Sequence, residues 1–181
     1  MNNQRTKLTI KLLEQSLIKL LSDKTIYQIS IRELCDVAGI NRSTFYRYFG
    51  SQFDLLSLME DELINNIQSY FSLDISNLDE TSIRKQMILM LEYLKSNYDF
   101  TKLLLNNNVD PEFPNRLFEL SCIKALIDRA VGDRDLGELT DYYKTYMITG
   151  GFSVLRLWVN NGCTLESKVV ADSLAKFSAI Q

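Results

Sequence analysis

The 181-residue sequence contains no histidine, only two prolines and seven glycines, and just three cysteines. Without histidine the chain lacks the commonest general base and the usual partner in a catalytic triad, so we expect no enzymatic activity. Glycine-rich phosphate-binding motifs are also absent from the sequence, and we expect no cofactor. Few helix-breaking residues, together with apolar residues at helical spacing, predict an all-α protein.

The cysteines Cys35, Cys122 and Cys163 are too widely spaced for a disulfide framework or a zinc site, so we expect no metal. Cys35 and Cys122 are expected in packed cores, and Cys163, which follows Gly162, in an exposed turn. A thiol sensor remains an alternative, although reduced structural cysteines are commoner. Apolar runs are far shorter than the roughly 18 residues of a membrane span, which predicts a cytoplasmic protein outside the membrane.

Charge is distributed unevenly along the chain. Residues 1–52 hold eight Lys and Arg residues against four acids, a net charge of +4. Residues 53–181 hold 12 against 19, a net charge of −7. A polyanion is therefore attracted to the first segment and repelled by the second. The acidic cluster Glu60-Asp61-Glu62 is expected to be a solvated run rather than an acid–base pair.

Residues 30–52, SIRELCDVAGINRSTFYRYFGSQ, have the layout of a helix-turn-helix. Ser30 and Glu33 have the spacing of a capping box at the start of the first helix. Gly39 suits the left-handed residue at its end, and Asn41 can cap the next helix. A step of about 100° per residue gives that helix two faces, one polar and one largely apolar. The polar face holds Arg42, Ser43, Tyr46 and Arg47, and the other face Thr44, Phe45, Tyr48 and Phe49.

A face of hydroxyls and cations without any acid is typical of a DNA-reading helix, whereas an ordinary surface helix more often carries Glu and Lys pairs. Ser51 and Asp54 then have capping-box spacing at the start of a long helix, about 51–71. That helix is expected to connect the two halves of the chain. Its expected apolar seam is Phe53, Leu56, Met59, Leu63, Ile67 and Phe71.

These features resemble the TetR family of bacterial regulators. The resemblance lies in a long first helix, the phrases SIRELCDVAGI and NRSTFYRYF, and SQFDLL at the start of a long fourth helix. It is strong over about the first 60 residues, and beyond them it is only a pattern of helices. It implies a three-helix DNA-binding domain, residues 1–52, joined by a long helix to a ligand-binding and dimerisation domain, residues 53–181, with about nine helices in all.

The resemblance also implies which residues contact double-stranded DNA. It assigns phosphate contacts to Ser30, Thr44, Tyr46 and Tyr48, and base reading to Arg32, Arg42, Ser43 and Arg47. Asn41 and Gln52 complete the set. Many members have a lysine where this chain has Gln52, which can donate a hydrogen bond but adds no charge, so we expect this contact to be weaker here.

The last two apolar segments, about 138–160 and 165–180, are expected to form a homodimer interface. The first is apolar on most of its circumference, which suits burial on two sides, although a monomeric core helix is the alternative. Its phrase GGFSVLRLWVNNG resembles the C-terminal half of a Gram-positive branch of the family. In the family, two such helices from each subunit form a four-helix bundle, and the resemblance implies the same here. The expected interface residues are Phe152, Leu155, Trp158, Val159, Val170, Leu174 and Phe177.

Methionine and aromatic side chains between 87 and 152 could line a cavity for a hydrophobic small molecule or fill a dry core. Some of these side chains lie in the segment 115–131, whose apolar residues have helical spacing and predict a helix. The candidate residues are Met87, Met90, Tyr93, Leu94, Phe100, Leu104, Phe113, Phe118, Cys122, Tyr143, Met147 and Phe152.

We interpret the chain as a homodimeric repressor that binds a palindromic operator through paired major-groove helices and leaves it when a small-molecule effector binds. One alternative is a DNA-bound protein that recruits another protein without an inducer. A second alternative is a ligand-binding protein that has lost DNA binding. An accessible apolar cavity favours the first interpretation, whereas a filled core with an exposed apolar patch favours recruitment.

Overall fold

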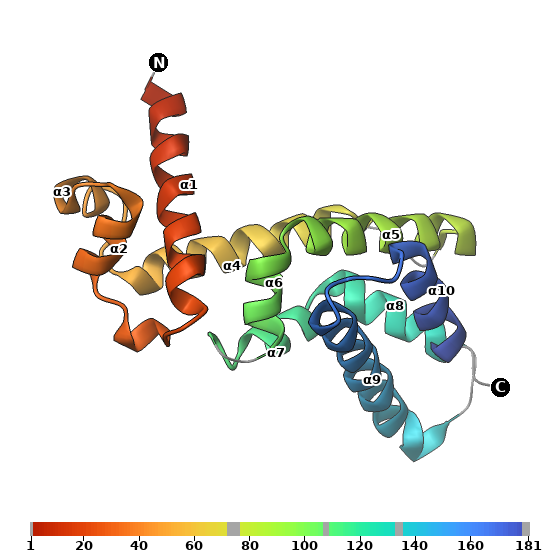
Figure 1. Ribbon diagram of the computed structural model, residues 1–181. Helices are drawn as coiled ribbons and strands as arrows, with labels where there is room; N and C mark the ends of the chain where they lie inside the picture. The colour runs from red at the N-terminus through yellow and green to blue at the C-terminus, as the bar shows by residue number, and fades with distance from the viewer. Residues whose placement is uncertain (1, 72–76, 107–108, 133–135, 179–181) are drawn as a thin grey trace. The chain divides into compact units, whose positions relative to one another are not determined.

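The computed structural model describes residues 2–71, 77–106, 109–132 and 136–178. Within these ranges the regular elements are helices and no strand occurs, which confirms the predicted all-α class. Figure 1 shows the α-helices, which are α1 Asn2–Leu21, α2 Ile31–Ala38, α3 Arg42–Phe45, α4 Gln52–Ser69, α5 Glu80–Ser96, α6 Tyr98–Leu105, α7 Phe113–Phe118, α8 Ser121–Val131, α9 Thr140–Asn160 and α10 Ser167–Ser178. None of the described helices is long and apolar enough to cross a membrane.

The chain divides into two compact units. The N-terminal unit comprises residues 1–63 with 108–111, and the C-terminal unit residues 64–107 with 112–181, so the division falls within α4. In the N-terminal unit α2 packs against both α1 and α3. Burial of large apolar side chains stabilises this unit. Its fully buried side chains include Leu13, Leu17, Ile29, Leu34, Phe45 and Leu55.

Helix α4 buries most of its expected apolar seam, but two of its residues differ from the sequence prediction. Phe53 is 40% exposed, whereas Glu60 is only 3% exposed. Glu60 lies one turn after the buried Leu56 and three residues before the buried Leu63, so helical geometry places its side chain on the buried face. The expectation that Glu60 belongs to a solvated run is therefore wrong.

The C-terminal unit is a set of helices that pack against one another. Helix α5 packs along α10 and against α6, while α9 contacts α6, α8 and α10 (Figure 1). Arg84 of α5 forms a two-pronged ion pair with Asp172 of α10, through Nε to Oδ1 and Nη2 to Oδ2. The innermost side chains of this unit include Leu91, Thr101, Leu104, Phe113, Val159 and Ala171.

The segment 115–131, with its continuous helical spacing, forms two helices rather than one. Leu120 has extended backbone angles, φ −61° and ψ 131°, and separates α7 from α8. The break lets α7 pack against α6 while α8 packs against α9. Local spacing allows a single helix here, and tertiary packing on two different neighbours interrupts it.

Cys163 is buried, 3% exposed, which corrects the expectation of an exposed turn. Its backbone takes a left-handed conformation, φ 52°, and its N–H donates to the carbonyl of Trp158 at 3.0 Å. The indole N–H of Trp158 in turn donates to the carbonyl of Leu165 at 3.0 Å. The turn between α9 and α10 is thereby folded over Cys163, and burial raises the pKa of its thiol.

Candidate nucleic-acid interface

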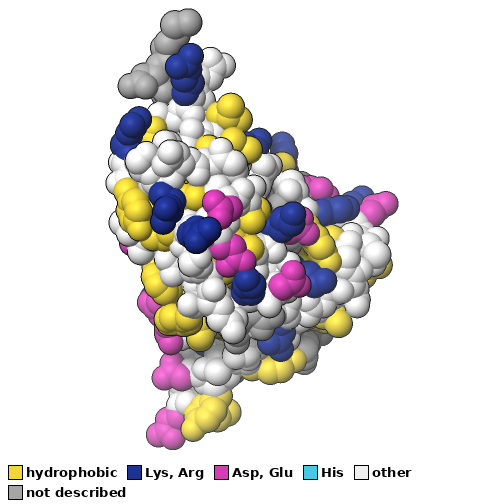
Figure 2. All heavy atoms as spheres, turned by 60° about the vertical axis from the view of Figure 1, so that its left-hand side comes forward, with side chains coloured by type: hydrophobic (Ala, Val, Ile, Leu, Met, Phe, Trp, Pro, Cys, Tyr) yellow, Lys and Arg dark blue, Asp and Glu magenta, His cyan; other side chains and the backbone are white. Residues whose placement is uncertain are grey.

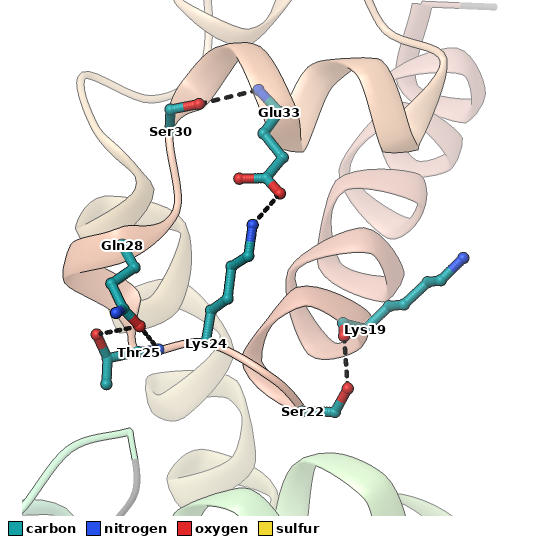
Figure 3. Close-up of polar contacts among 7 residues, drawn as sticks. All are labelled: Lys19, Ser22, Lys24, Thr25, Gln28, Ser30 and Glu33. Carbon is teal, nitrogen blue, oxygen red and sulfur yellow. Dashed lines mark hydrogen bonds and ion pairs between the residues drawn. The ribbon is translucent and has the colours of Figure 1, made fainter.

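The start of α2 is fixed by two polar contacts shown in Figure 3. Ser30 has an extended backbone, and its Oγ accepts a hydrogen bond from the Glu33 N–H at 3.2 Å. The Glu33 carboxylate pairs with Lys24 Nζ in the preceding turn. Only the first half of the predicted capping box is therefore present, because Lys24 competes for the carboxylate that would otherwise return to Ser30. Ser30 itself is exposed at the helix start.

The turn between the two short helices follows the prediction. Gly39 ends α2 in the left-handed region, φ 65° and ψ 29°, which a side chain would disfavour. Ile40 N–H then donates to the Cys35 carbonyl at 3.0 Å. Asn41 Oδ1 accepts from both the backbone N–H and the hydroxyl of Ser43, each at 3.0 Å. Asn41 is thus the N-cap of α3, as its sequence position indicates.

Helix α3 is short and continues as tight turns. After Phe45, the Tyr48 and Phe49 N–H groups donate to the Phe45 carbonyl at 2.9 and 3.0 Å. Phe45 has no exposed surface, and its ring lies 5.5 Å from the Phe49 ring and 5.7 Å from that of Tyr46. This aromatic cluster anchors the segment to the core of the N-terminal unit.

The exposed face of the α3 segment matches the sequence-derived division. Arg42, Ser43, Tyr46 and Arg47 are exposed, while Thr44 and Tyr48 are partly exposed. Arg32 on α2 is also exposed, with Nε 3.8 Å from Asp36 Oδ2. A loose, solvent-exposed pair of this kind contributes little stability, so Arg32 can turn toward another anion. The structure brings the cations and hydroxyls of one short segment onto a single face.

The start of α4 is capped by a reciprocal pair. Asp54 Oδ2 accepts hydrogen bonds from the Gly50 N–H at 2.8 Å and the Ser51 N–H at 3.2 Å, and Ser51 Oγ accepts from the Asp54 N–H at 3.3 Å. The hydrogen bond from the Ser51 hydroxyl, followed by that from Gly50, lowers the pKa of Asp54. Gln52 is the first residue of α4 and is partly exposed.

Replacing Asp54 with alanine is expected to lower the melting temperature at pH 7. Because the folded-state pKa of Asp54 is lowered, its carboxylate stabilises the fold above the ordinary carboxyl pKa, and this contribution is lost as the pH falls through the lowered value. The wild-type and Asp54→Ala melting temperatures should therefore converge in strong acid. Thermal melts across an acid pH series test this, with the exposed Asp23→Ala as control. A constant difference at every pH would contradict the assignment.

Sequence reasoning missed an exposed aromatic pair beside this interface. Tyr27, in the 3-10 turn Ile26–Gln28, is 83% exposed, and its ring lies 5.3 Å from that of Phe53. The neighbouring Ile26 and Ile29 are buried and hold the turn in place. A signal existed in the sequence, because Tyr27 stands between two buried isoleucines and must point the other way.

The candidate ligand residues of the C-terminal unit fall into two groups. Phe118 of α7 and Phe152 of α9 contact each other edge to face, with ring centroids 5.4 Å apart, and the Arg156 guanidinium lies 6.0 Å from the Phe152 ring. Partly exposed candidates are Met87, Tyr93, Phe118, Tyr143, Met147 and Phe152. Buried candidates are Met90, Leu94, Phe100, Leu104, Phe113 and Cys122.

The candidate dimer residues also separate by burial. Trp158, Val159 and Val170 are buried within this chain, at most 4% exposed, so they are core residues of the protomer rather than a free surface. Phe152, Leu155 and Leu174 are partly exposed, and Phe177 is 55% exposed. Further exposed apolar side chains on and between the same helices, absent from the predicted set, are Tyr142, Tyr146, Leu157, Leu165 and Val169.

Figure 2 turns the left-hand side of Figure 1 forward. Dark-blue Lys and Arg side chains lie over much of this face, and below its upper part magenta Asp and Glu side chains lie among them. The upper part of the face combines cations with neutral polar surface, which suits the phosphates and base edges of a nucleic acid.

Comparison with known proteins identifies two matching family models. One, described as bacterial regulatory proteins of the tetR family, matches residues 16–59, and another, described as a transcriptional regulator C-terminal region, matches residues 81–179. The HTH-type dhaKLM operon transcriptional activator DhaS of Lactococcus lactis subsp. lactis (strain IL1403) is 26% identical over 147 residues, 79% of this chain and 70% of that protein.

Solved structures share the fold. A TetR transcriptional regulator from Streptococcus agalactiae 2603V aligns with a TM-score of 0.64 at 18% identity, covering 98% of this chain and 95% of that chain. FadR from Bacillus subtilis, in complex with stearoyl-CoA, aligns with a TM-score of 0.60 at 16% identity, covering 94% of this chain and 99% of that chain. Both similarities extend over nearly the whole chain.

Proposed function

Because this chain belongs to the TetR family of bacterial DNA-binding transcriptional regulators, we propose that it binds a palindromic operator as a homodimer and represses transcription until a small molecule releases it. The observation that carries the DNA-reading part is the α3 segment. Arg42, Tyr46 and Arg47 are exposed together, while Phe45 between them is fully buried and holds the segment in place. The proposal locates the protein in the cytoplasm, where bacterial DNA lies.

In this proposal the α3 segment enters the major groove. Arg42 and Arg32 read base edges, for which a planar guanidinium is suited, with Ser43 and Arg47 beside them. Uncharged side chains set the register of the protein by donating hydrogen bonds to the DNA phosphates, and they add no positive charge to the interface. These residues are Ser30, Thr44, Tyr46, Tyr48, Asn41 and Gln52. The affinity should therefore depend on a small number of cations.

Dimerisation supplies the second half-site. A single short reading helix rarely gives specific binding alone, and a two-fold symmetric dimer places two such helices about one DNA turn apart. The exposed apolar side chains of α9 and α10, including Tyr146, Leu157 and Phe177, offer the surface that a second copy would cover.

The proposed effector is a hydrophobic small molecule that binds among the helices of the C-terminal unit. Partly exposed Met87, Tyr143 and Met147 supply adaptable apolar contacts. The structural neighbour FadR was solved with stearoyl-CoA, which supports an apolar ligand for this fold. An effector that binds one conformation better than the DNA-competent one shifts the population away from DNA.

A second candidate function is activation by recruitment of another protein. It is favoured by the curated relative, whose name is that of a transcriptional activator. In this case the exposed aromatic side chains Tyr142 and Tyr146 would contact a protein partner instead of remaining free.

The first experiment is selection of bound duplexes from a random DNA pool by the purified chain at two salt concentrations. Enrichment of an inverted repeat, weakened by salt, is the expected result and gives the operator. In vitro transcription from a promoter that carries this repeat then distinguishes repression from activation. Failure to enrich any sequence would overturn the proposed operator binding.

A further inference from the structure

We propose that the first half of α1 is a second DNA-contacting element, in which Arg5 and Lys7 bind the sugar–phosphate backbone beside the groove that α3 enters. This inference rests on the DNA binding proposed above. Arg5 and Lys7 lie outside the helix-turn-helix segment 30–52. The residues of that segment proposed to contact phosphates are uncharged, so Arg5 and Lys7 would supply charged phosphate contacts.

A single hydrogen bond places this part of α1 next to the reading segment. Thr6 Oγ1 lies 3.2 Å from the phenolic oxygen of Tyr48, although the two residues are 42 positions apart in the chain. Tyr48 is one of the residues expected to contact a phosphate. Arg5 and Lys7 directly precede and follow Thr6, and both are exposed. DNA that contacts Tyr48 therefore passes close to these two cations.

The charge of this segment fits a polyanion. Residues 4–13 include Arg5, Lys7 and Lys11 and contain no acid, since the first acidic residue of the chain is Glu14. Neither Arg5 nor Lys7 forms an ion pair in the part of the chain that the structure describes. In Figure 2 the upper part of the forward face shows dark-blue side chains without magenta ones among them. The two cations are thus available for phosphates.

Thr6 acts as a positioning residue in this arrangement. The hydrogen bond between the Thr6 and Tyr48 hydroxyls orients the Tyr48 side chain, and it also fixes the position of α1 relative to the α3 segment. The helical backbone of α1 fixes the spacing between Arg5 and Lys7 before DNA arrives, which reduces the ordering cost of binding.

The first test is the salt dependence of DNA affinity for the double variant Arg5→Ala/Lys7→Ala, on both the selected repeat and a scrambled duplex. Each lost phosphate contact should reduce the slope of log affinity against log salt by about 0.9, so four losses in a dimer reduce it by up to about 3.6. We expect at least tenfold weaker binding and an unchanged melting temperature. An unchanged slope on both duplexes would overturn the inference.

Lys19→Ala is the matched control. Lys19 lies in the same helix, about 21 Å from Arg5 at 1.5 Å per residue. Its side chain points away from the Lys24–Glu33 ion pair (Figure 3). Lys19→Ala should leave the slope of log affinity against log salt unchanged. If Lys19→Ala reduced the slope as much per residue as Arg5→Ala/Lys7→Ala does, the effect would come from the net charge of the protein, and the proposed contacts of Arg5 and Lys7 would be wrong. If the wild-type protein selects no operator, the slope measured on the scrambled duplex still tests the phosphate contacts of Arg5 and Lys7. Failure of the proposed operator binding can therefore be distinguished from failure of this inference.

The second test distinguishes the hydrogen bond made by the Thr6 hydroxyl from the packing of the Thr6 side chain. Thr6→Val removes the hydrogen bond to Tyr48 at nearly constant volume, whereas Thr6→Ser keeps it. We expect several-fold weaker binding for Thr6→Val and recovery for Thr6→Ser, with equal melting temperatures. Wild-type affinity in Thr6→Val would show that Thr6 does not position Tyr48 and would overturn this part of the proposal.

Discussion

Arg42→Ala is expected to weaken binding to the selected operator by roughly 30-fold to 20,000-fold. A bidentate contact between a guanidinium and a base edge contributes about 1–3 kcal/mol, and a dimer loses two such contacts. Arg42 is the first residue of α3, is exposed, and follows the N-cap Asn41, so its removal leaves the helix start intact. Titration of labelled operator duplex by fluorescence anisotropy measures the loss.

Arg42→Lys is the informative control. Lysine keeps the positive charge and the attraction to phosphates but cannot form the planar two-pronged contact. We expect the salt dependence of binding to be retained and the discrimination between operator and scrambled duplex to fall. If Arg42→Ala instead weakened binding to both duplexes equally, Arg42 would be a phosphate contact and the base-reading role would be wrong.

Phe45→Ala is expected to destabilise the N-terminal unit by about 3–5 kcal/mol, the usual cost of truncating a buried phenylalanine. Phe45 has no exposed surface and contacts the rings of Tyr46 and Phe49. A loss of this size is a large fraction of the stability of a typical domain, so specific DNA binding should disappear with it. Urea unfolding followed by circular dichroism measures the change in free energy of unfolding.

Phe45→Leu keeps most of the apolar volume and is expected to cost less and to retain operator binding. The comparison separates the anchoring of the α3 segment from any direct contact with DNA, which Phe45 cannot make because it is buried. Wild-type stability in Phe45→Ala would show that the aromatic cluster does not hold this segment in place.

Local chemistry of the N-terminal unit could be predicted from the sequence with few errors. Ser30, Gly39 and Asn41 occupy the expected cap positions, and Ser51 caps α4 together with Asp54. These signals lie within a few residues of the groups they satisfy, so no knowledge of the rest of the fold is needed. The exposed and buried sides of the α3 segment follow from helical geometry in the same way.

The errors concern residues whose environment comes from distant segments. Glu33 turns to Lys24 instead of completing its cap, and Cys163 is covered by a turn that the Trp158 side chain holds in place. Trp158 is buried within its own chain, and the apolar circumference of its helix did not indicate which of its faces the chain itself covers. Each outcome depends on which helix packs against which face, and apolar spacing alone does not specify the neighbour.

The all-helical class, the helix-turn-helix with its caps, and the exposed face of α3 can be predicted from the amino-acid sequence alone, because they depend on contacts between near neighbours in the chain. Three other features became visible only in the folded chain: α1 reaches Tyr48 through Thr6, Glu60 is buried, and α7 and α8 are separate helices. These features arise from contacts between residues far apart in the sequence, and the packing of the helices determines which of those residues meet.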